Sequence, residues 1–154
     1  MLNTTQFWQF CLSWYGRPGV SQACIELQDK LGLNVNLILL LCWCEQQKLP
    51  LSVEQIERLS LSLQTWSIKY TQPLRQLRRQ LALEDHADER VKRTIFDAEM
   101  ALEKTEQRLL IGTFCDFDLH VSDDKVQNLT RYVSLTDSKG VLRFAEQLAV
   151  IRGN

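Results

Sequence analysis

One apolar segment constrains the fold of this chain more than any other feature. Residues 36–44 read Asn-Leu-Ile-Leu-Leu-Leu-Cys-Trp-Cys, and Glu45 follows directly. A helix that spans a bilayer needs about 20 apolar residues, so this run is too short to cross a membrane. A helix that is apolar on all sides is typical of a protein interior. We therefore expect a buried central helix over residues 36–47, covered by the rest of the chain.

The rest of the chain carries apolar residues at intervals of three and four, which is the pattern of helices packed on one face. No window alternates in the manner of a β-strand. Helices are predicted over about 4–15, 18–31, 52–81 and 88–110, with further helices within 123–152. The sequence thus predicts one all-α domain over residues 1–154, a bundle of about six to seven helices.

The fourth predicted helix is interrupted by a proline. Its apolar stripe runs from Val53 to Leu81 and keeps its spacing through Pro73. Since proline removes one helical hydrogen bond, we expect one kinked helix or two abutting helices here. In the next helix, the residues expected to face inward are Val91, Ile95, Ala98, Leu102 and Leu109.

Charge and cysteine content limit the classes of function. The 18 basic and 19 acidic residues give a net charge of −1, which argues against general binding of nucleic acid. The first residues lack the features of a secretory signal. Five cysteines are an odd number and favour a reducing compartment over a disulfide framework. We expect a cytoplasmic protein that does not bind membranes.

Residues that could carry chemistry are few. On a helix the thiols of Cys42 and Cys44 point in different directions, so we expect core packing and no shared metal. His120 with Asp116 and Asp118 could hold a weak metal ion or form an acid–base pair, but an exposed acidic loop explains the same residues. The sequence therefore predicts no catalytic residue, no metal and no cofactor, and it favours a protein that is not an enzyme.

A basic set lies opposite an acidic set on two predicted helices. The basic residues are Arg75, Arg78 and Arg79; the acidic residues are Asp97, Glu99, Glu103 and Glu106. If the helices form an antiparallel hairpin, Arg75 lies level with Asp97 and Glu99. Ion pairs between the helices explain this pattern, and binding of an anion or a partner by the arginines is the alternative.

A second possible binding position is Arg17. It stands in the turn Gly-Arg-Pro-Gly, next to the start of a helix, where an anionic ligand could bind. Tight-turn geometry alone also explains the glycines and the proline.

Two segments resemble a known family. They are residues 7–37, from Phe-Trp-Gln-Phe-Cys-Leu to Asn-Leu, and Trp66 followed by Pro-Leu-Arg-Gln-Leu-Arg at 73–78. They resemble an uncharacterised family of small proteobacterial proteins with a domain of unknown function, over about residues 5–110. The resemblance implies a bacterial, cytoplasmic, helical protein and supplies no activity. The polar or amphipathic members of its pattern are Tyr15, Arg17, Gln28, Asp29, Asn36, Trp66, Arg75, Arg78 and Glu99.

Two functional hypotheses follow. The first is a non-enzymatic interaction or regulatory protein that engages an unidentified protein partner, with Trp8, Trp14 or Trp66 exposed at the binding surface. The second is a bundle, possibly an enzyme, that binds a small ligand between helices, near Trp66, Tyr70 and Arg75 and closed by Glu99. The candidate binding residues are Arg17, Trp66, Arg75, Arg78 and Glu99. Nucleic-acid binding by the arginines around residues 75–93 is the least favoured reading, and the oligomeric state is left open.

Overall fold

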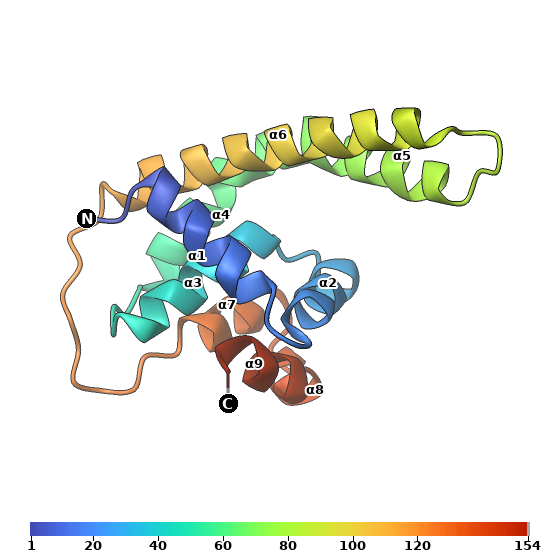
Figure 1. Ribbon diagram of the computed structural model, residues 1–154. Helices are drawn as coiled ribbons and strands as arrows, with labels where there is room; N and C mark the ends of the chain where they lie inside the picture. The colour runs from blue at the N-terminus through green and yellow to red at the C-terminus, as the bar shows by residue number, and fades with distance from the viewer. Residues whose placement is uncertain (154) are drawn as a thin grey trace.

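The computed structural model describes residues 1–153 and consists of helices joined by turns and loops (Figure 1). No strand occurs in these residues, so the predicted all-α fold is confirmed. The elements in chain order are α1 (Thr4–Tyr15), α2 (Val20–Leu31), α3 (Val35–Gln46), α4 (Val53–Trp66), the π-helical turn η1 (Ser67–Thr71), α5 (Gln72–Ala82), α6 (Glu89–Phe114), α7 (Asn128–Thr136), α8 (Gly140–Arg143) and α9 (Ala145–Arg152).

Helix α3 is the buried centre that the apolar run predicts. Its residues 36–42 and Cys44 are all buried, and all of them except Asn36 belong to one hydrophobic core cluster with residues of most other helices. Asn34 is the N-cap of the helix, since its side chain accepts a hydrogen bond from the backbone N–H of Leu37 at 3.1 Å. The helix starts one residue earlier than predicted and ends at Gln46.

The two N-terminal helices follow the sequence signals closely. Asn3 and Gln6 form a capping box at the start of α1. Helix α2 begins at Val20 and not at residue 18, because Gly19 adopts a left-handed conformation with φ of 79°. Gly32, with φ of 69°, ends this helix as predicted.

The interruption at Pro73 takes the form of a π-helical turn. Helix α4 begins with a capping box of Ser52 and Gln55, at the start of the predicted range. The backbone N–H of Gln72 then bonds to the carbonyl of Ser67, five residues back, and the wider turn leads directly into α5. The segment from α4 to α5 is thus one continuous helical path with a local change of winding.

The inward face predicted for α6 is wrong for most of its members. Val91, Ala98 and Leu109 are exposed, and Ile95 and Leu102 are half-buried. The buried residues of this helix are Glu99, Glu106, Gln107, Leu110, Ile111 and Phe114. The reason is that the first half of α6 pairs with α5 through ion pairs, while the apolar core residues of α6, Leu110, Ile111 and Phe114, all lie in its second half.

The C-terminal third differs from the prediction at its element boundaries. Helix α6 continues to Phe114 into the stretch expected to be a loop, and α7 begins at Asn128, later than expected. The last predicted helix, 141–151, is divided into α8 and α9 at Phe144, whose side chain is buried. These divisions and η1 account for more helical segments than the six to seven expected.

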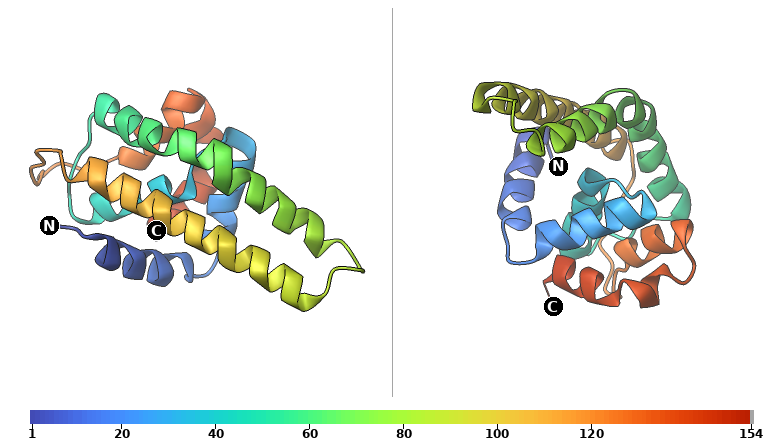
Figure 2. Two further views of the ribbon diagram at one scale, coloured as in Figure 1. Left: turned by 90° about the horizontal axis from the view of Figure 1, so that it is seen from above. Right: turned by 90° about the vertical axis from the view of Figure 1, so that its right-hand side faces the viewer.

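Helix α5 and residues 89–103 of α6 form an antiparallel hairpin, here called the arm, that extends beyond the remaining helices, here called the body (Figures 1 and 2). No residue of α5 is buried. The arm runs above α1 and α2, and its tip lies far from the core (Figure 1). Within residues 1–153, no helix combines the length and the apolar character needed to cross a bilayer.

Candidate functional site

The two helices of the arm are joined by a cluster of ion pairs. Arg75 bonds to Glu99 at 3.3 Å and to Glu103 at 3.2 Å, and Arg78 binds both oxygens of Glu99. The side chains of Arg75 and Glu99 are only 16% and 5% exposed. The predicted pairing between the basic and acidic sets therefore exists, although Asp97 pairs with Arg93 on its own helix and Glu106 takes part in no ion pair of the described residues.

Two adjoining hollows, here together called the cleft, lie between the arm and the body. The wider one has a volume of about 650 Å³ and is bordered by α2, the loop before α3, and the path from α4 to α5. Side chains with amide groups are frequent on its walls: Gln28, Asn34, Gln64, Gln72 and Gln76. Ser67 of the π-helical turn and Tyr132 of α7 also line it.

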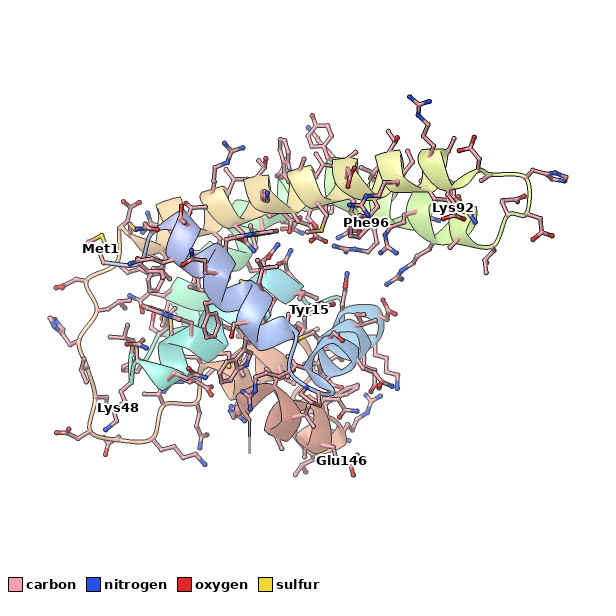
Figure 3. All side chains as sticks on the ribbon, viewed as in Figure 1. Met1, Tyr15, Lys48, Lys92, Phe96 and Glu146 are labelled. Carbon is pink, nitrogen blue, oxygen red and sulfur yellow. The ribbon has the colours of Figure 1, made fainter. Side chains whose placement is uncertain are left out.

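The narrower hollow has a volume of about 310 Å³ and lies between α1, α2, α3 and the arm. Its apolar lining includes Trp8, Leu12, Ile25, Leu39 and Met100. Tyr15, at the end of α1, lies on this side, below the arm (Figure 3). The two hollows share Gln28, Val35, Arg75 and Arg79 as lining residues, so they meet beneath the arm. Their volumes are in the range of small-molecule sites.

A buried polar network joins α3 to α6 at the cleft. Asn34 and Asn36 each donate a side-chain hydrogen bond to Oε2 of Glu106, at 3.2 and 3.0 Å. Gln107 donates in turn to Oδ1 of Asn36 at 3.0 Å. Glu106 and Gln107 are only 1% and 3% exposed. Oε1 of Glu106 and Oε1 of Gln107 have no hydrogen-bond partner among residues 1–153.

This arrangement is unusual because buried acceptors are normally paired. Leaving such a group without a partner costs free energy, and the cost is larger for a charged group. Glu106 lines the wider hollow and Gln107 the narrower one. Each hollow is therefore lined by one residue that has an unpaired acceptor oxygen.

Burial also changes the acid–base properties of the narrower hollow. It raises the pKa of the Glu103 carboxyl above its ordinary value, although the neighbouring Arg75 opposes this shift. The pKa of the Tyr15 hydroxyl is raised as well, chiefly by burial. In contrast, hydrogen bonding to Glu99 raises the pKa of the Arg78 guanidinium, which stays charged.

Three of the five candidate binding residues come together. Arg75, Arg78 and Glu99 all line the narrower hollow. Trp66 lies outside the cleft lining: its indole N–H donates to the carbonyl of Leu102 at 3.2 Å and its ring packs on Tyr70. Trp66 and Tyr70 therefore line neither hollow, whereas Arg75 and Glu99 do lie beside them.

Arg17 is also outside the cleft lining. Its guanidinium lies 4.0 Å from the centre of the Trp14 ring and packs closely on Gly153 near the C-terminus. Trp8, Trp14, Trp43 and Trp66 are each half-buried, so none of the tryptophans is freely exposed as the interaction hypothesis expected.

The sequence did not predict that Glu106 and Gln107 lie at the base of the cleft. It placed Glu106 opposite the arginines and indicated no role for Gln107. A polar pair at the centre of a long helix, between the apolar residues Leu102 and Leu110, is the only signal the sequence offers. That signal is weak because the same pair would suit an exposed face.

The side chains considered for metal or nucleophile chemistry do not assemble into a centre. Cys42 and Cys44 are buried, and burial raises the pKa of Cys42 to about 12 and also raises that of Cys44. His120 is highly exposed and lies 3.6 Å from Asp118. Within residues 1–153, no three His, Cys, Asp or Glu side chains are grouped so as to hold a metal ion.

Comparison with known proteins gives a family but no activity. A family model described as "Protein of unknown function (DUF2390)" matches residues 6–110. This range includes every lining residue of the cleft except Tyr132. No curated protein and no solved structure matches the chain.

Proposed function

The chain belongs to the DUF2390 family of proteins of unknown function, and we propose that it is a non-enzymatic binding protein that holds a small ligand in the cleft between arm and body. The observation that carries this proposal is the pair of unpartnered buried oxygens, one on Glu106 and one on Gln107, both on residues that line the cleft. A bound ligand that donates hydrogen bonds would remove the cost of burying them.

The walls of the cleft support the same proposal. Apolar side chains in the narrower hollow offer contact area, and amide side chains in the wider hollow offer both donors and acceptors. An enclosed apolar region with a few polar groups is the usual composition of a small-molecule site. The ion pairs of Arg75 and Arg78 with Glu99 and Glu103 join the two helices of the arm beside this region.

Native mass spectrometry on the protein gently purified from cells that express it naturally tests the proposal. We expect a small non-covalent adduct on the wild-type chain. The matched variants are Ser60→Trp, which places a large side chain in the wider hollow, and Ser134→Trp, which lies on α7 away from it. The adduct should be lost only in Ser60→Trp. An adduct of equal occupancy in a folded Ser60→Trp variant would contradict this location.

A second candidate function is engagement of another protein through the arm. Leu83 at its tip is 87% exposed, and Val91 and Phe96 are 45% and 41% exposed, so apolar side chains are accessible away from the core. Lys92 and Phe96 mark this part of α6 in Figure 3. Accessible apolar groups on a projecting hairpin favour contact with a protein partner over contact with nucleic acid, because most of the neighbouring cations are already paired.

Photo-crosslinking in living cells tests this second function. A crosslinking amino acid at Leu83 should give a discrete covalent product with one partner. The control is the same amino acid at Leu142 of α8, which is equally exposed at 87%. Equal products from both positions would indicate random contacts and would contradict a role for the arm.

We also propose a bacterial, cytoplasmic location, as the family resemblance and the cysteines suggest. All five cysteines are free, and four are buried in the core. Thiols of this kind suit a reducing compartment.

A further inference from the structure

We propose that the ligand of the cleft is a small organic cation, a primary ammonium or a guanidinium compound, whose N–H groups bind the carboxylate of Glu106. This inference rests on the proposed binding function and assigns the chemical class of the ligand.

The balance of charge in the cleft is the first argument. The charged residues that line the two hollows are four carboxylates and three guanidinium groups: Asp29, Glu99, Glu103 and Glu106, against Arg75, Arg78 and Arg79. Arg75 and Arg78 pair with Glu99 and Glu103, and Arg79 pairs with Asp29. Glu106 is therefore the carboxylate of the cleft that lacks a cationic partner.

The hydrogen bonds around Glu106 are the second argument. Its Oε2 is fixed by the amide groups of Asn34 and Asn36, whereas the buried Oε1 has no partner among residues 1–153. A ligand donor that reaches Oε1 would meet an acceptor that is already held in place. Gln107 also has an unpaired acceptor oxygen, so both residues would be satisfied by hydrogen-bond donors of a ligand. Ammonium and guanidinium groups supply several N–H donors together with positive charge.

The same contacts disfavour an anionic ligand. An anion at Arg75 or Arg78 would compete with Glu99, which already binds both guanidinium groups and whose side chain is only 5% exposed. The amino end of α3, which would otherwise attract an anion, already faces Glu106 through Asn34 and Asn36. Among the described residues, each arginine of the cleft is already paired with a carboxylate, which argues against the arginine-bound anion that the sequence left open.

The size and lining of the cleft restrict the cation further. The wider hollow, about 650 Å³, accepts more than a single ammonium ion, and the adjoining narrower hollow is lined by Leu12, Leu39 and Met100. A short alkyl chain attached to the cationic group would contact these apolar side chains. We expect binding to strengthen from methylammonium to n-butylammonium, because more apolar surface is removed from water.

Isothermal titration calorimetry with four probes of similar size tests the proposal: n-butylguanidinium, n-butylammonium, n-butyrate and n-butanol. The full-length protein, dialysed to remove any ligand carried through purification, should bind the two cations and neither of the other probes. In Glu106→Gln, which keeps an oxygen for Asn34 and Asn36, the affinity for the cations should fall about tenfold or more.

The matched control is Glu146→Gln. Glu146 is exposed on α9, on the opposite side of the molecule from the arm, and its replacement removes the same charge (Figure 3). This variant should bind the cations as the wild type does. Equal loss in both variants would show that the effect comes from net charge and not from the cleft.

The outcomes separate the inference from the proposed function. Binding of n-butyrate or n-butanol that Ser60→Trp abolishes would keep the cleft as a ligand site and overturn the cationic class. Binding of the cations that is unchanged in a folded Glu106→Gln would overturn the role of Glu106. Absence of binding by all four probes, together with a bare chain in native mass spectrometry, would overturn both proposals.

Discussion

Arg79 of α5 forms an ion pair with Asp29 of α2 at 3.3 Å, and among residues 1–153 this is the only ion pair that links the arm to α2. Both side chains are nearly half exposed, so the pair contributes little to global stability. It nevertheless spans the place where the two hollows meet, since Arg79 lines both of them.

Loss of this pair should loosen the arm without unfolding the protein. We expect Arg79→Gln to lower the free energy of unfolding by less than about 1 kcal/mol. Amide hydrogen exchange in residues 72–82 should become faster, because the contact that restrains α5 against the body is gone. Exchange in α9, measured in the same sample, serves as the reference. Unchanged exchange in α5 would show that its packing on α6 alone fixes the arm.

The ion pairs at Glu99 should behave differently because they are shielded from water. Glu99→Ala leaves Arg75 and Arg78 without their main partner, and we expect a loss of about 3 kcal/mol in the free energy of unfolding. Asp97→Ala removes an exposed pair on the same helix and should cost less than about 1 kcal/mol. Urea unfolding followed by circular dichroism measures both, and equal effects would argue that burial of Glu99 is unimportant.

The buried carboxylate at the base of the cleft should lower the stability of the protein when no ligand is bound. We expect Glu106→Gln to be at least as stable as the wild type without ligand, because it removes a buried charge that has no cationic partner. Asn36→Ala should instead lower the free energy of unfolding by about 2 kcal/mol, since it leaves Glu106 and Gln107 with fewer hydrogen bonds. Thermal denaturation of the dialysed proteins measures the two changes. A strongly destabilised Glu106→Gln would mean that the carboxylate is structural.

The cysteines should differ in reactivity. Burial raises the pKa of Cys24 and of Cys42 to about 12, and it also raises the pKa values of Cys11 and Cys44. Because the thiolate is the reactive form, these four thiols should react with Ellman's reagent at pH 8 only after unfolding. Cys115 is half-buried and should react in the native protein. Cys115→Ala should remove the fast phase, and rapid reaction of a second thiol would indicate local opening of the core.

The same shifts make stability depend on alkaline pH. A thiol with an ordinary pKa of 9.0 loses its proton in the unfolded chain above pH 9, while Cys24 and Cys42 keep theirs in the folded chain up to about pH 12. The unfolded state then binds fewer protons, so the free energy of unfolding falls as the pH rises. From pH 8 to pH 10 each such thiol should account for a loss of about 1.4 kcal/mol. Urea unfolding of wild type and Cys24→Ala at both pH values measures the slope, which should be smaller in the variant.

Much of the fold could be predicted from the sequence because local signals and long-range packing agree. The apolar run of α3, the capping box at Ser52 and the left-handed Gly32 each specify an element boundary or a buried position, and each is observed. Each of these signals depends only on residues a few positions apart, so it can be recognised in a single sequence.

The cleft could not be predicted in the same way because it depends on polar residues that are buried. Periodicity assigned Leu109 and Val91 to the core, whereas Glu106 and Gln107 lie there and both apolar residues are exposed. The pattern of a helix cannot reveal that partners on another element, such as Asn36, will satisfy a buried carboxylate. The sequence did predict the pairing of Arg75 with Glu99, because opposite charges at matching positions of two adjacent helices indicate an ion pair.

The π-helical turn at residues 67–71 also determines which side chains the arm presents to the cleft. An α-helix advances by about 100° per residue, and a π turn accommodates one additional residue in the path. The positions of α5 are thereby displaced around the helix axis relative to α4, which brings Gln72, Arg75, Gln76 and Arg79 to the cleft and leaves Tyr70 and Leu77 outside. The number of residues in this turn thus determines which side chains of α5 line the cleft. Removing one residue after Ile68 from this turn would bring Pro73, Gln76, Leu77 and Gln80 to these four positions, and the cleft would lose Arg75 and Arg79 from its wall.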